Sequence, residues 1–220
     1  MTFSIAGRCA RTGSFGIAIS TSSIAVGSRC PYARAGVGAV LTQHRTDPRL
    51  GPRGIALLQS GCSAQETLDA LVASSPQIGW RQLAVIDAQG RTAAFAGNRI
   101  SSIHNEVQGL DCVAIGNIIA SAGVPVAMAR IFERDPALPL AERLVQGLEA
   151  GLAAGGELKP VMSAALLVVH EQEFPLVDLR VDWTDAPIAT LRRLWTEYAP
   201  MVEEFVVRAL DPDKANVPPA

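Results

Sequence analysis

The chain has 220 residues, of which 49% are hydrophobic and 18% are charged, and its formal net charge is −2. A chain of this length buries roughly 70% of the surface that its unfolded form exposes, so we expect one domain over residues 1–210. The basic residues form no run, which argues against a nucleic-acid-binding surface. A secretory signal pattern is missing, and the longest uncharged stretch is interrupted by glycine and proline. We therefore expect a cytoplasmic protein without a membrane span.

The first half of the chain is predicted to hold strands around two short helices. Alternating or continuous apolar runs predict strands at residues 2–8, 14–20, 34–43, 81–87, 91–97, 100–108 and 111–117. Turn signals at Asp47-Pro48 and Gly51-Pro52 are followed by helical spacing over residues 53–60 and 64–73. Ser63 and Glu66 have the spacing of a capping box for the second helix.

The second half is predicted to alternate helices with one more strand pair. Helical spacing covers residues 124–133, 140–154 and 187–210, the last interrupted at Pro200, and strands are expected at 163–171 and 176–182. We expect a disordered tail over residues 211–220. Hairpin-length turns inside each block of strands favour antiparallel pairing over βαβ winding. The fold class is therefore α+β, with two packed antiparallel sheets covered by helices.

Thr2 is the residue whose type and position most clearly indicate a catalytic role. Removal of Met1 would leave a threonine whose α-amine, titrating near pH ~8, can take the proton of its own hydroxyl. One residue would then supply both nucleophile and base. Aminopeptidases that remove methionine accept threonine at the second position, so no propeptide is required. The alternative is that Thr2 is a β-branched residue that starts an edge strand.

The cysteines and histidines are too dispersed to predict a metal site. No pair forms Cys-x-x-Cys, and no histidines have His-x-His or His-Glu-x-x-His spacing. The residues concerned are Cys9, Cys30, Cys62, Cys112, His44, His104 and His170. We expect buried reduced thiols, no metal and no organic cofactor.

Several short stretches, in their order along the chain, resemble one bacterial family. They are Thr2-Phe3-Ser4-Ile5, Ala25-Val26-Gly27, residues 35–40, Thr42-Gln43, residues 51–54, Arg81-Gln82-Leu83, Gly116-Asn117 and residues 163–169. The family is domain-of-unknown-function family 1028, grouped with the N-terminal-nucleophile (Ntn) hydrolases, and the resemblance runs from Thr2 to about Leu194. It implies a four-layer αββα sandwich. It also implies amide hydrolysis by an N-terminal Thr, Ser or Cys, and Thr2 matches that position.

Asn117 is the candidate for the second catalytic role. The Ntn resemblance implies an amide donor near the nucleophile, and Asn117 ends a predicted strand where its side chain would hold an oxyanion. Such an interaction is worth roughly 3 kcal/mol in other enzymes. The alternative is a strand-end asparagine that satisfies its own turn.

Four further residues are candidates for substrate binding. Thr21 and Gln43 lie at or near the ends of strands, where they would bond the Thr2 amine or a substrate, or else buried backbone. Arg81 begins a strand, and its guanidinium would hold a substrate carboxylate unless it is a surface charge. Ser163 would reach the first hairpin from a neighbouring strand, or simply pack there.

The leading functional hypothesis is an amidohydrolase that attacks a small-molecule amide or a peptide through Thr2 and forms an acyl-enzyme. One alternative is a non-catalytic relative that uses the cleft to bind a small molecule, because fold does not fix function. Another is an assembly protein that forms a homo-oligomer. We expect no nucleic-acid partner and no membrane partner.

Overall fold

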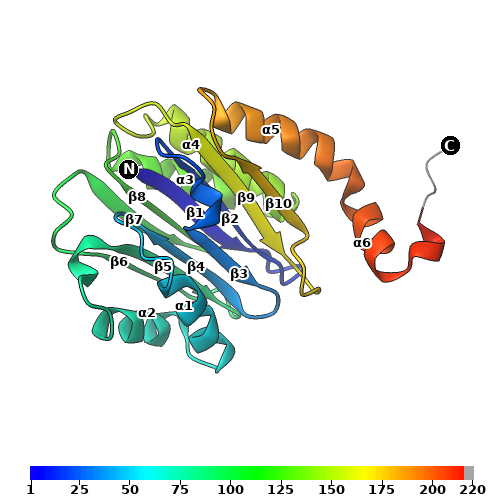
Figure 1. The fold of residues 1–220 in the computed structure, drawn as a ribbon, viewed down its shortest axis with the longest axis horizontal. Helices are drawn as coiled ribbons and strands as arrows, with labels where there is room; N and C mark the ends of the chain where they lie inside the picture. The colour runs from blue at the N-terminus through cyan, green and yellow to red at the C-terminus, as the bar shows by residue number, and fades with distance from the viewer. Residues whose placement is uncertain (216–220) are drawn as a thin grey trace.

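The computed structural model describes residues 1–215 and contains two antiparallel sheets (Figure 1). The larger sheet has six strands in the order β10-β9-β2-β1-β8-β7. These strands are β1 (Thr2–Arg8), β2 (Phe15–Thr21), β7 (His104–Gly109), β8 (Cys112–Asn117), β9 (Ser163–Val169) and β10 (Val177–Val181). The smaller sheet has the order β3-β4-β5-β6, with β3 (Pro31–Arg34), β4 (Gly38–Gln43), β5 (Gln82–Asp87) and β6 (Thr92–Ala96).

The apolar faces of the strands decide where the helices lie. Phe3 and Ile5 of β1 belong to a core shared with the helices α3 (Gly123–Arg134) and α4 (Leu140–Ala153). Ala6, on the opposite face of β1, belongs to the core between the two sheets. The helices α1 (Leu50–Gln59) and α2 (Ala64–Ala73) pack on the outer face of the smaller sheet. Both sheets are thus covered on their outer faces.

Of the last two helices, the first packs on the body of the molecule and the second leaves it. An ion-pair cluster attaches α5 (Pro187–Tyr198) to α4, because Arg192 contacts Glu142 at 2.6 Å and Glu149 at 2.8 Å. After a 3-10 turn at Ala199–Met201, α6 (Val202–Leu210) extends away from the sheets (Figure 1). The predicted interruption at Pro200 is confirmed.

Three predicted boundaries were wrong. Residues 34–43 form parts of two strands, β3 and β4, because Gly36 adopts a left-handed φ of 69° and turns the chain. The first helix begins at Leu50 because Pro52 lies in its first turn, where a missing N–H breaks no bond. The strand expected from residue 100 begins at His104.

Pro212–Lys214 form a short 3-10 helix, and residues 216–220 of the expected disordered tail lie outside the described residues. Within residues 1–215, no helix has the length and apolar character needed to cross a bilayer.

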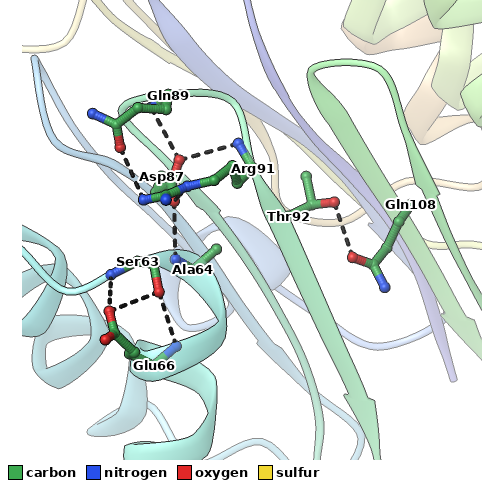
Figure 2. Close-up of polar contacts among 8 residues, drawn as sticks. All are labelled: Ser63, Ala64, Glu66, Asp87, Gln89, Arg91, Thr92 and Gln108. Carbon is green, nitrogen blue, oxygen red and sulfur yellow. Dashed lines mark hydrogen bonds and ion pairs between the residues drawn. The ribbon is translucent and has the colours of Figure 1, made fainter.

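Asp87 joins the smaller sheet to α2 through a buried carboxylate. Its oxygens accept hydrogen bonds from the backbone N–H groups of Ala64, Gln89 and Arg91, and Arg91 Nε lies 2.7 Å away (Figure 2). Burial alone would raise the pKa of Asp87, but these bonds outweigh burial and lower it. Beside this contact, Ser63 and Glu66 form the predicted capping box. The carboxylate therefore has a structural role.

We expect Asp87→Ala to lower the free energy of unfolding by about 2–3 kcal/mol at neutral pH, because it leaves the buried Ala64 N–H without an acceptor. Since the folded pKa is depressed, the contribution is present above the ordinary carboxyl pKa and is lost as the pH falls through the folded value. Urea unfolding monitored by circular dichroism measures this loss. Asp69→Ala, which removes an exposed carboxylate of α2, is the control; equal losses would contradict the assignment.

Candidate functional site

Strand register brings four of the predicted site residues into one row at the end of the larger sheet. Thr2 of β1 pairs with Asn117 of β8, and Thr21 of β2 pairs with Ser163 of β9. The hydroxyl oxygens of Thr2 and Thr21 lie 3.4 Å apart, and all four side chains are buried. Thr2 shares the face of β1 that points between the sheets, because Ala6 lies in that core.

The carbonyl of Met1 lies against both threonine hydroxyls. Thr21 Oγ1 donates to this oxygen at 2.6 Å, and Thr2 Oγ1 is also within hydrogen-bond reach of it. A hydroxyl has one hydrogen to donate, so Thr2 donates either to the carbonyl or to Thr21. Thr21 thus holds the Met1 carbonyl beside the Thr2 hydroxyl.

Glu157 is the buried carboxylate of this site, and no pattern in the sequence indicates it. Its Oε2 accepts from the backbone N–H of Ser22 at 3.0 Å, and its buried Oε1 has no partner in hydrogen-bond geometry among residues 1–215. Burial raises the pKa of Glu157 to about 7, although the Ser22 bond and the Met1 amine oppose the rise. Burial also lowers the pKa of the Met1 amine, and Glu157 opposes that change.

A buried network of side-chain amides lies behind the row. Ser4 Oγ donates to Gln43 at 2.8 Å, and Gln43 Nε2 donates to Gln82 Oε1 at 2.8 Å. Asn117 Nδ2 donates to the same Gln82 oxygen at 3.0 Å, whereas the buried Asn117 Oδ1 has no partner in the described part of the chain. Gln43 thus contacts Ser4 and Gln82, and it supports Asn117 through Gln82.

Ser163 and Arg81 have different surroundings. Ser163 Oγ donates to the carbonyl of Ser23 at 2.7 Å and accepts from the N–H of Val26 at 3.2 Å. It therefore fixes the loop that follows Thr21. Arg81 is not among the residues that line the cavity beside Met1, although its neighbour Trp80 is.

A cavity of 290 Å³ lies beside Met1. Its other lining residues come from the loops that follow β4 and β8 and that precede β5 and β7; they are His44, Arg45, Trp80, Arg99, Ser101, Ser102 and Ile118. His44 Nδ1 lies 2.6 Å from the carbonyl of Trp80. That contact requires a hydrogen on Nδ1, and burial, as the largest influence, lowers the pKa of His44. The ring is therefore neutral at pH 7, with Nε2 free of hydrogen.

Backbone strain gathers around this cavity. His44, Arg45 and Ile118 have φ values of 52°, 39° and 53°, in the left-handed region that residues with a side chain rarely adopt. For the β-branched Ile118 this conformation is a genuine outlier. Such strain persists only where surrounding contacts over-determine the conformation, and it clusters at functional sites.

Comparisons with known proteins identify one family. The model described as "Family of unknown function (DUF1028)" matches residues 2–191. The crystal structure of protein SPO2555 from Silicibacter pomeroyi, described with the family model DUF1028, is 30% identical at a TM-score of 0.83, covering 90% of this chain and 89% of that one. Anbu (ancestral beta-subunit) from Yersinia bercovieri has 12% identity and a TM-score of 0.40, covering 93% and 96%, a likeness too low for structural inference. The comparison with curated proteins gives no match.

Glu157 provides a pH test of the site. Its folded pKa of about 7 exceeds the ordinary value of 4.5, so between these values the folded protein keeps a proton that the unfolded chain loses. Stability should therefore fall as the pH rises through this window, by on the order of 3 kcal/mol. We expect Glu157→Gln to match the wild type at pH 4 and to be the more stable protein at pH 8.

Thermal unfolding between these pH values measures the difference between the two proteins. Glu173→Gln, at an exposed carboxylate, is the control and should parallel the wild type throughout. Parallel curves for Glu157→Gln and the wild type would contradict a raised pKa at Glu157.

Proposed function

Because this chain belongs to DUF1028, a family of unknown function, we propose its function from its own site: an amidohydrolase with Thr2 as the N-terminal nucleophile. The observation that carries the proposal is the contact between the Met1 carbonyl and the hydroxyls of Thr2 and Thr21. A carbonyl beside Thr2 is thereby already in a pocket that can polarise it.

In the proposed reaction, removal of Met1 exposes the α-amine of Thr2. That amine takes the hydroxyl proton as Thr2 Oγ1 attacks the substrate carbonyl, and then gives it to the leaving amine when the amide bond breaks. Water, activated by the same amine, hydrolyses the acyl-enzyme ester and releases the acid. Removal of Met1 also extends the 290 Å³ cavity towards Thr2, because Met1 forms part of its wall.

Neighbouring residues would stabilise the intermediate and hold the substrate. Thr21 donates to the oxyanion as it does to the Met1 carbonyl, and the second N–H of Asn117 Nδ2 is the proposed further donor. Gln43 positions Asn117 through Gln82, and Ser163 holds the loop after Thr21. Arg81 is proposed to act at longer range on an anionic substrate.

The arrangement of layers supports the same proposal. Two antiparallel sheets face each other, with α1 and α2 outside one and α3 and α4 outside the other. We propose that this is the αββα sandwich of the Ntn hydrolases, with the nucleophile on the first strand of the larger sheet. The chemistry needs no metal and no organic cofactor.

A second candidate is a non-catalytic small-molecule-binding protein. One observation favours it: the cavity of 290 Å³ is already open beside Met1, without exposure of the Thr2 amine. Binding in this candidate would use the cavity residues alone.

We expect Thr2→Ala to lower amide turnover by at least about a thousandfold, because it removes the attacking oxygen. The assay is a screen of amides, lactams and short peptides with the native protein, followed by kinetics on any substrate found. Thr2→Ser is the matched control, since it keeps a hydroxyl and should retain part of the activity. Full activity in Thr2→Ala, with the mutation verified, would exclude Thr2 as nucleophile.

Intact-mass spectrometry of the native protein tests whether the amine is available. We expect the mass of a chain without Met1, because Thr2 is small enough for aminopeptidase processing. Complete retention of Met1 in the native protein would contradict the amidohydrolase and favour the binding protein.

A further inference from the structure

The cavity beside Met1 contains two guanidinium groups arranged around one aromatic ring. The Arg45 guanidinium lies 4.0 Å from the centroid of the Trp80 ring, and that of Arg99 lies 5.6 Å from it. His44 stacks on the same ring at a centroid distance of 6.4 Å and an interplanar angle of 11°. Arginine stacked in this way keeps its N–H donors free for a ligand.

Neither arginine has an acidic partner within residues 1–215. Arg8, Arg49, Arg91, Arg180, Arg192 and Arg208 each form an ion pair with a carboxylate. Among the described residues, by contrast, Arg45 has no ion pair, and Arg99 makes only a 3.4 Å bond to the neutral Gln77. The residues that line the cavity include no Asp or Glu. The described lining of the cavity is therefore positively charged, with no carboxylate to compensate it.

Two further features indicate that the cavity is a ligand-binding site. Ser102, which lines the cavity, has a buried hydroxyl without a partner among the described residues. Arg45 and His44 both adopt left-handed backbone conformations, which aim them from the end of β4 at the cost of strain. Polar groups that are unsatisfied in this way are expected where a ligand completes their bonds.

We propose that this cavity binds a carboxylate of the substrate, held by Arg45 and Arg99, with the scissile amide directed towards Thr2. The inference rests on the proposed function for the direction of the amide, because Met1, which lines the cavity, is the residue that precedes Thr2. A planar guanidinium donates two parallel hydrogen bonds to a carboxylate, which selects carboxylates over neutral amides of the same size. The substrate class is therefore an N-acylated amino acid or a related amide acid.

The test uses binding, so that it does not depend on turnover. The full chain carrying Thr2→Ala is titrated calorimetrically with benzoylglycine and with benzoylglycinamide, which differ only in the carboxylate. We expect at least tenfold tighter binding of benzoylglycine, and a preference that weakens as salt screens the arginines. In the same background, Arg45→Gln together with Arg99→Gln should abolish the preference.

The control is Arg34→Gln together with Arg53→Gln. These two arginines are also exposed and bond only the neutral side chains of Gln59 and Ser74, so the change in net charge is the same. The control should keep the preference. Because all four arginines are exposed, the folds should be preserved, which circular dichroism verifies.

Equal binding of the two probes, or a preference that survives in the Arg45 and Arg99 double variant, would overturn the proposal. The experiment distinguishes failure of the carboxylate site from failure of the proposed amidohydrolase. A carboxylate preference without any turnover by the native protein would remove the hydrolase and leave the anion site. Turnover of neutral amides without a preference for benzoylglycine would keep the hydrolase and remove the anion site.

Discussion

The amide network between the two sheets is the contact on which the site depends. Gln82 Oε1 accepts from Gln43 of its own sheet and from Asn117 of the opposite sheet, in a buried environment where a lost partner is costly. His44 and Arg45 follow Gln43 directly, and Trp80 comes two residues before Gln82. The network therefore fixes the distance between the threonines of the larger sheet and the side of the cavity that Arg45 and Trp80 contribute from loops of the smaller sheet.

Much of the fold could be predicted from sequence because its determinants are local. Alternating apolar residues gave the first hairpin, and the Ser63 and Glu66 spacing gave the helix cap. The turn at Gly36 was missed because small residues surround it and hide the change of direction. Local patterns thus predicted which helices and strands exist better than the residues at which they begin and end.

The site could be predicted only in part, because only some of its determinants are local in the sequence. Thr2, Thr21, Asn117 and Ser163 were candidates because each lies at or near a strand end. The pairing that puts them in one row, β1 with β8 and β2 with β9, joins strands far apart in the chain. The cavity residues and Glu157 come from loops whose proximity depends on how the sheets pack, which no spacing in the sequence encodes. Left-handed φ values at His44 and Ile118 gave no signal either, because glycine is the usual residue there.

The position of Met1 has a practical consequence for handling the protein. Its carbonyl contacts both threonines, and its amine is partly buried near Glu157, so the chain start fills the site. An affinity tag fused ahead of Met1 would run a peptide through the cavity and prevent methionine removal. Because α6 extends from the opposite side of the molecule (Figure 1), a carboxy-terminal tag leaves this region undisturbed. Under the proposed mechanism, a tag ahead of Met1 therefore yields a preparation in which Thr2 has no free amine.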